Sequence, residues 1–264
     1  MRDRFDYKAY WEMLDRLRAT HRPVRFADVN DRFPDKPFFI LRHDVDYSID
    51  AALALAEQES ARRVHASYFL LPNGLYYNLL DPAHARAPRR LIELGHEVGL
   101  HYDVNFLYRF PSDRWPELMR LQAGILETLC GATVQSIAMH QPGLNGDDPL
   151  RDTPAFLNAY DDRFIREMPY LSDSCRAWRD SAWRLLDSGD LPPRFQLALH
   201  PINWAEVDRD RVTIFRALHR EIATSIEAAG AVLLEQISRH DAVLEHDART
   251  RRHAAAGGGP AVER

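Results

Sequence analysis

The sequence has only two cysteines, Cys130 and Cys175, so a disulfide framework is excluded and a reducing compartment is expected. Its apolar runs, such as Ala66–Leu71, are far shorter than the roughly 20 residues that a membrane-spanning helix needs. The opening residues MRDRFD alternate in charge and lack the apolar stretch of a secretory signal. We therefore expect a cytoplasmic protein without a transmembrane segment.

Positive charge is not in excess either. The 34 lysines and arginines stand against 39 aspartates and glutamates, which gives a net charge of −5. A nucleic-acid surface usually shows as net basic charge, so no nucleic-acid partner is expected. The 264 residues are 45% hydrophobic and 28% charged, a composition typical of a soluble globular chain. This length suits one large domain better than two.

Helical and strand-like segments alternate along most of the chain. Apolar residues at helical spacing predict a helix over Tyr7–Arg18 and another over Ile49–Arg63, with Ser48 as its N-cap. The other predicted helices are Pro88–Leu94, Asp113–Leu129, Val212–Ala229 and Glu235–Leu244. The predicted strands are Phe38–Leu41, His65–Leu71, Glu97–His101, Val134–Met139, Phe195–His200 and Ala231–Leu234. The alternation predicts a parallel sheet flanked by helices, either doubly wound or closed into a barrel.

Ionisable side chains follow four of the predicted strands. In an α/β barrel, catalytic groups lie at the carboxyl ends of the strands, where the loops converge. The residues at these ends are Arg42, His43, Asp44 and Asp46 at the first strand, His101 and Asp103 at the third, His140 at the fourth, and His200 at the late strand Phe195–His200. The same pattern on four strands indicates an active site.

The residue types at these strand ends suit a divalent metal. Asp44 and Asp46 are two residues apart, so they project to the same side of an extended chain. Carboxylate oxygen and imidazole nitrogen bind such a cation, and a catalytic site leaves one position open for water. One aspartate could bind the metal while the other takes a proton from the water, which leaves His200 to protonate a leaving group.

These residues and their order resemble the polysaccharide deacetylases of carbohydrate esterase family 4, also called the NodB-homology family. Within that family, the likeness is greatest to a branch that deacetylates or deformylates lipid-linked aminosugars. The resemblance spans roughly residues 38–244 and rests on four motifs: Leu41–Asp46 (LRHDVD), Gly95–His101 (GHEVGLH), Ser172–Arg176 (SDSCR) and Leu197–His200 (LALH).

The resemblance implies an α/β fold, a distorted (β/α)7 TIM-like barrel with an added N-terminal helix. We expect a single barrel domain over residues 1–247, in which residues 1–36 form a helical extension packed on the barrel. Residues 248–264 include the low-complexity run AAAGGGP after a basic cluster, which predicts a disordered tail.

The resemblance also implies roles for individual residues. Asp44 corresponds to the general base, Asp46 and His101 to metal ligands, and His200 to the general acid. The position of the family's second metal-binding histidine holds Asn105, a weaker ligand for zinc than imidazole. His140, Asp103 or His43 are the candidates to take its place.

A second departure concerns the arginine that commonly steadies the catalytic aspartate in the family's third motif. This chain has MHQPG over Met139–Gly143 instead, which leaves Arg42 and Arg176 as candidates to supply the charge. The residues expected to contact the substrate are His43, Arg42, His140, Asp173, Arg176 and Trp204.

The implied function is the metal-dependent removal of an acetyl or formyl group from an aminosugar, with zinc as the expected metal. A cytoplasmic enzyme would meet a nucleotide- or lipid-linked precursor, which points to surface-polysaccharide or lipopolysaccharide biosynthesis. One alternative is a catalytically inactive barrel that binds a carbohydrate or a protein. Another is a metallohydrolase on the same barrel that cleaves a cyclic amide or a phosphoester.

Overall fold

The computed structural model describes residues 4–29, 32–146, 148–151 and 153–256. The chain divides into two compact units, Met1–Ile214 and Phe215–Arg264. None of the helices in the described ranges is long and apolar enough to cross a membrane.

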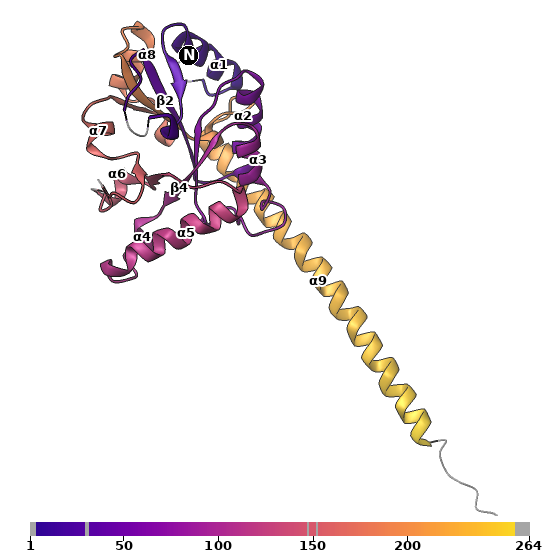
Figure 1. The fold of residues 1–264 in the computed structure, drawn as a ribbon. Helices are drawn as coiled ribbons and strands as arrows, with labels where there is room; N and C mark the ends of the chain where they lie inside the picture. Colours follow the sequence, from indigo (N-terminus) through magenta and orange to yellow (C-terminus); the bar gives the residue numbers. More distant parts are fainter. Residues whose placement is uncertain (1–3, 30–31, 147, 152, 257–264) are drawn as a thin grey trace, which may run out of the picture. The chain divides into compact units, whose positions relative to one another are not determined.

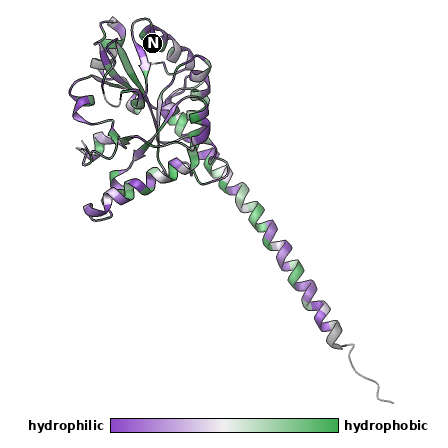
Figure 2. Cartoon of the chain, in the orientation of Figure 1, coloured by the Kyte–Doolittle hydropathy of each residue, from purple (hydrophilic) through white to green (hydrophobic). Residues whose placement is uncertain are grey.

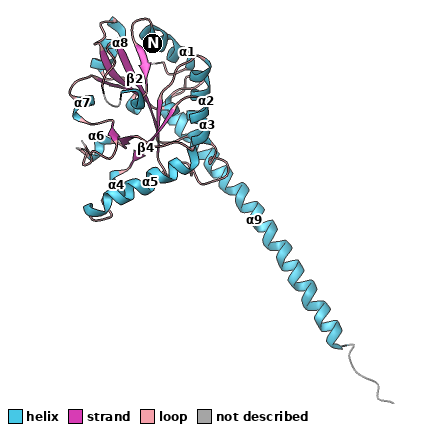
Figure 3. Cartoon of the chain, in the orientation of Figure 1, coloured by secondary structure: helices cyan, strands magenta, loops and turns pink. Residues whose placement is uncertain are grey.

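The first unit is built on a parallel sheet (Figure 3). Its strand order is β6-β5-β4-β3-β2-β8-β7, and β1 joins the sheet by pairing with β2. The sheet curls into an open half-barrel, which confirms the expected α/β fold of the distorted barrel type. The strands are β1 Arg22–Val24, β2 Phe38–Val45, β3 Ser67–Leu70, β4 Glu97–Tyr102, β5 Ser136–Met139, β6 Leu157–Asn158, β7 Tyr170–Ser172 and β8 Arg194–Leu199.

Strand β2 pairs with three other strands, β1, β3 and β8, and is buried at every position. The first part of β2, Phe38–Ile40, pairs with β1, and Arg42–Val45 pairs with β3. Strand β8 pairs with Phe38–His43 along the other edge of β2. A continuous apolar run such as Phe38–Leu41 is typical of a parallel strand covered on both faces. Figure 2 shows apolar residues gathered on these strands.

Helices follow the strands of the first unit (Figure 1). Helix α1 begins after Asp6, whose carboxylate accepts a hydrogen bond from the Ala9 N–H, and Ser48 caps α2 by accepting from the Ala51 N–H. Helices α3 and α5 pack together, and α2 also contacts α3. The helices are α1 Tyr7–Arg18, α2 Ile49–Ala61, α3 Ala87–Glu93, α4 Val104–Leu107, α5 Trp115–Cys130, α6 Pro142–Asn145, α7 Asp162–Ile165 and α8 Asp180–Ser188.

Helix α9, Arg211–Ala256, continues from the last residues of the first unit through the described part of the second. The strand expected at Ala231–Leu234 is wrong, because these residues lie inside this helix. Periodicity cannot tell an apolar run this short from a segment of helix. The tail expected over 248–264 is helical as far as Ala256, and the rest of it lies outside the described residues.

Candidate active site

Side chains from four strands converge at the carboxyl edge of the sheet. Asp44 lies near the end of β2 and Asp46 follows that strand, whereas His101 lies in β4. His140 comes directly after β5, and His200 directly after β8. Because all the strand pairs are parallel, these ends meet at one edge of the sheet.

Three of these side chains form a cluster with metal-ligand geometry. One ligand atom from each of Asp46, His101 and His140 lies within 4.8 Å of the other two. Asp46 Oδ1 is 3.1 Å from His101 Nε2 and 3.9 Å from His140 Nε2. Two imidazoles and a carboxylate make a donor set that suits zinc, and catalytic zinc sites with three protein ligands leave the fourth position to water.

The hydrogen bonds around this cluster leave its nitrogen atoms available to a metal. His101 Nδ1 donates to the Ala138 carbonyl at 2.8 Å, so Nε2 has the lone pair on the side of Asp46. His140 Nε2 is buried and has no hydrogen-bond partner among the described residues. Burial lowers the pKa of His140, and the nearby His101 lowers it further. His140 is thus held in the neutral form that binds metals.

Asn105 makes hydrogen bonds outside the cluster of Asp46, His101 and His140. It is exposed in α4, and its amide nitrogen donates to Asp103 Oδ1 at 3.1 Å and to Asn145 Oδ1 at 3.2 Å. Asp103 caps α4 by accepting a hydrogen bond from the Asn105 backbone N–H. The third member of the cluster is His140, the substitute considered for Asn105. Asn105 as a ligand stays a prediction.

Asp44 is fixed by Arg42, two residues earlier on the same face of β2. The guanidinium donates to both carboxylate oxygens, from Nε at 2.6 Å and from Nη2 at 2.8 Å. Burial alone raises the pKa of Asp44, but the charge of Arg42 outweighs it and holds this pKa well below its usual range. Arg42 is fully buried and also donates to the Tyr160 hydroxyl. Arg42 therefore supplies the positive charge beside Asp44 that was expected from Arg42 or Arg176. Its complete burial contradicts the expected contact between Arg42 and the substrate.

His200 is oriented by a buried carboxylate. Its Nδ1 lies 2.7 Å from Asp173 Oδ1, and its Nε2 lies 3.9 Å from Asp46 Oδ2. Burial lowers the pKa of His200, but the hydrogen bond to Asp173 and the charges of Asp173, Asp46 and Asp44 outweigh this and raise it to about 9. His200 therefore presents Nε2 to the site in its protonated form at neutral pH.

Two residues expected to contact the substrate instead support His200. Asp173 is fully buried, and its second oxygen accepts a hydrogen bond from Trp204 Nε1 at 2.8 Å. Trp204 is itself buried against the rings of Phe5 and Tyr10. Asp173 and Trp204 are thus corrected from substrate contacts to positioning residues.

Two further expected residues lie apart from the cluster. His43 is fully buried with its Nε2 2.9 Å from Glu59 Oε1, because successive side chains of a strand alternate between its faces. Arg176 pairs with Asp208 and lies 4.5 Å over the Phe5 ring. His43 is not in the ligand cluster, and its complete burial contradicts the expected contact with substrate. The expected contact of Arg176 with substrate stays a prediction.

Sequence reasoning missed Tyr160, which positions the guanidinium of Arg42. Its hydroxyl accepts the Arg42 hydrogen bond at 2.8 Å, and the guanidinium also lies 4.8 Å from the centre of the Tyr160 ring. Tyr160 follows β6, a strand of two residues, which is too short to give a periodic signal. The sequence offers no other pattern that would have singled it out.

Comparison with known proteins gives structural neighbours only. No protein-family model matches the chain, and no curated protein matches it. A carbohydrate esterase family 4 pseudoenzyme from Bacillus anthracis has a TM-score of 0.44 at 15% identity, over 76% of this chain and 65% of its own. The peptidoglycan deacetylase PdaC from Bacillus subtilis has a TM-score of 0.43 at 13% identity, over 75% of this chain and 98% of its own.

A family 4 carbohydrate esterase from Bacillus anthracis is similar at a TM-score of 0.42 and 12% identity, over 80% of this chain and 86% of its own. The chain thus spans slightly less than two thirds of the length of the pseudoenzyme. At such scores and identities, function has to be inferred from the chemistry of the site.

Proposed function

We propose that this protein is a metal-dependent hydrolase that removes an N-acyl group, acetyl or formyl, from an aminosugar. The observation that supports this most strongly is the cluster of Asp46, His101 and His140 with Asp44 and His200 beside it. Asp44 Oδ2 is 4.0 Å from His101 Nε2, and His200 Nε2 is 3.9 Å from Asp46 Oδ2. A ligand set, a carboxylate held ionised and a protonated imidazole are thus collected at one edge of the sheet.

Asp46, His101 and His140 are the residues that would hold the metal, for which we propose zinc. The ion supplies Lewis-acid polarisation of the acyl carbonyl and activates water for attack. His140 Nε2 is buried and has no hydrogen-bond partner in the described part of the chain, which supports this assignment. An unpaired polar atom in the interior costs free energy unless a ligand satisfies it.

Asp44 is the proposed general base. Its carboxylate is next to the ligand cluster and is held ionised by Arg42, so it can accept a proton from the attacking water. The two hydrogen bonds from the guanidinium fix the orientation of the carboxylate. Arg42 and Tyr160 therefore act through Asp44 as positioning residues.

His200 is the proposed general acid. The nitrogen of an amide must be protonated before it can leave, and His200 carries a proton at neutral pH because its pKa is about 9. The hydrogen bond from Nδ1 to Asp173 directs Nε2 toward the site. Asp173 and Trp204 fix the position of that ring.

For the substrate class we propose an acylated aminosugar linked to a nucleotide or a lipid, in surface-polysaccharide or lipopolysaccharide biosynthesis. The motifs Leu41–Asp46 and Gly95–His101 support this through their resemblance to enzymes of lipid-linked aminosugars. The proposal places the protein in the cytoplasm, where such precursors are made.

Chelation tests the function directly. Removing divalent metal is expected to lower acetate or formate release from an N-acylated aminosugar at least roughly 100-fold, because carbonyl polarisation is then lost. Adding zinc to the chelated protein should restore the rate, measured as acid released over time. Release that chelation leaves unchanged would contradict the metal's role. No release of either acid from free, nucleotide-linked or lipid-linked sugars would favour the inactive, carbohydrate-binding alternative.

A further inference from the structure

A polar cavity of about 350 Å³ lies at the opposite edge of the sheet from the candidate active site. It is formed where α1 ends, where β1 begins and where the chain passes from α2 to β3. These are the amino ends of β1 and β3, since β1 pairs with the start of β2. The residues that determine its charge are Arg18, Arg22, Arg25, Arg63, His65 and Asp28.

This cavity, called the arginine pocket below, concentrates positive charge on a chain whose net charge is −5. Four arginines and one carboxylate line it. Arg25 pairs with Asp28 at 2.8 Å, and Arg18 pairs with the exposed Asp15 at 3.6 Å. Among the described residues, neither Arg22 nor Arg63 has an ion pair within 4 Å. Two guanidinium groups are therefore available to an anion.

Two side chains of the arginine pocket, Arg25 and His65, are held by contacts within the chain. Arg25 is held by both oxygens of Asp28, and its Nη1 donates to the Gly95 carbonyl at 3.2 Å. His65 packs against the same glycine, where a Cβ atom would lie 2.8 Å from His65 Nε2. Gly95 has φ +90°, which also favours glycine. One loop residue thus positions two of the basic side chains.

Arg63 occupies a backbone position that glycine usually takes. It follows the C-cap of α2 with φ 56°, its N–H donates to Ser60, and the Val64 N–H donates to Glu59, both at 2.9 Å. These two bonds define a Schellman motif, in which the left-handed residue is ordinarily glycine. A side chain there adds backbone strain, and strained residues of this kind cluster at functional sites. Here the side chain adds a cation to the pocket.

We propose that the arginine pocket binds a compact, multiply charged anion of the phosphate class, such as a diphosphate group. Guanidinium groups match phosphate oxygens in pairs of parallel hydrogen bonds, and several arginines around one cavity suit more than one phosphate oxygen. A cavity of about 350 Å³ fits a small anion or one charged head of a larger molecule.

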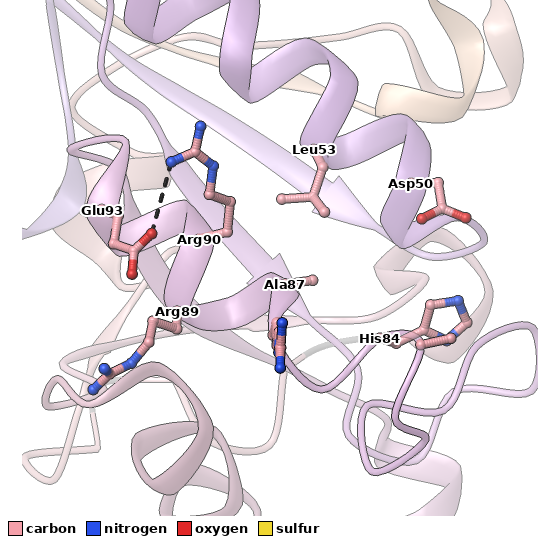
Figure 4. Close-up of a pocket in the computed structure, with 9 residues that line it drawn as sticks. Asp50, Leu53, His84, Ala87, Arg89, Arg90 and Glu93 are labelled. Atoms are coloured by element: carbon pink, nitrogen blue, oxygen red, sulfur yellow. Dashed lines mark ion pairs between the residues drawn. The ribbon is translucent and has the colours of Figure 1, made fainter.

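The cavity between α2 and α3 offers a contrast within the same unit (Figure 4). It has a volume of about 390 Å³ and is also lined by arginines, among them Arg89 and Arg90. Asp50 and Glu93 line it as well, and Arg90 pairs with Glu93 at 3.7 Å. Positive and negative charges are therefore closer to balance in this cavity. Arg89→Ala removes one positive charge, as Arg22→Ala and Arg63→Gly do, and so serves as their matched control.

Calorimetric titration with inorganic pyrophosphate at low ionic strength tests the proposal. The wild-type chain should bind, Arg22→Ala and Arg63→Gly should each weaken binding roughly tenfold or more, and Arg89→Ala should bind as the wild type does. The Arg63→Gly chain should melt at the same temperature or higher, because glycine relieves the strain at this position. Loss of binding in that variant is then not a failure to fold.

Two results would overturn the proposal. One is the absence of pyrophosphate binding to the wild-type chain. The other is equal binding by all the variants, which would place the anion elsewhere, for example on the metal of the active site. If pyrophosphate binds, sedimentation with vesicles of phosphatidylcholine and phosphatidic acid distinguishes a lipid phosphate from a free phosphate compound as the natural ligand. Sedimentation that depends on Arg63 supports a lipid phosphate, and pyrophosphate binding without sedimentation supports a free phosphate compound.

Discussion

Asp44→Asn is expected to lower turnover of an N-acylated aminosugar by at least about 100-fold while the metal stays bound. The amide has nearly the shape of the carboxylate but cannot accept a proton from the attacking water. Asp44 is not one of the three clustered ligands, so the metal content should be that of the wild type. Acid release and metal per chain, measured on the same preparation, test both halves of this expectation.

The control for this variant concerns stability. Arg42 is fully buried, and the substitution leaves its charge without a carboxylate partner. Breaking a buried ion pair costs about 3–5 kcal/mol, so the melting temperature should fall and the assay has to be run well below it. If metal is lost together with activity in the folded variant, Asp44 is itself a ligand and the proposed roles of Asp44 and Asp46 are reversed.

His200→Ala should have its effect on one kind of substrate only. Hydrolysis of an N-acetyl sugar should fall by about 100-fold or more, because the departing nitrogen then has no proton donor. An activated aryl ester should be hydrolysed nearly as fast as before, since a phenolate leaves without help. The ratio of the two rates is the measurement, with folding checked by circular dichroism. Equal losses on both substrates would remove His200 from the catalytic set.

Asp173→Asn tests the role of His200 by a milder change than His200→Ala. It keeps the imidazole but removes the charge that helps to raise the pKa of His200. A general acid works only while protonated, so activity falls as pH rises through its pKa. The alkaline limb of the pH–rate profile for amide hydrolysis should therefore move to lower pH. A purely structural Asp173 would lower the rate without moving that limb.

The sequence predicted the elements that have a clear period or a clear cap. Helix α1 has the predicted bounds Tyr7–Arg18, and α2 begins at Ile49 after the predicted cap Ser48. Strands β1, β6 and β7 were not predicted, because segments of two or three residues give no periodic signal. The pairing of these short strands depends on longer neighbours that are distant in the sequence.

Position along a strand predicted which residues lie at the candidate site better than residue type did. Asp44, Asp46, His101 and His200 were expected at strand ends, and the structure brings them to one edge of the sheet. His43 has suitable chemistry but lies on the opposite face of β2, at Glu59. Alternation along the strand predicts this separation once the face of Asp44 is known.

The motif Gly95–His101 does not by itself show which of its residues belong to the site and which hold the strands together. His96 accepts a hydrogen bond from the Ala66 N–H, while Glu97 accepts from Ser67 Oγ and Ser136 Oγ on the strands to either side. These contacts join β3, β4 and β5, and only His101 of this motif reaches the ligand cluster. The role of His140 could not be derived either, because several residues were equally able to replace Asn105 by chemistry alone.

His140 is proposed to complete the metal site in place of Asn105. The most direct measurement is the metal content of protein purified without chelator, compared between His140→Ala and Asn105→Ala. The wild type and Asn105→Ala should each hold about one ion per chain, and His140→Ala should hold far less, as should Asp46→Ala and His101→Ala. Full metal content in His140→Ala, or loss of the metal in Asn105→Ala alone, would show that His140 is not the third ligand.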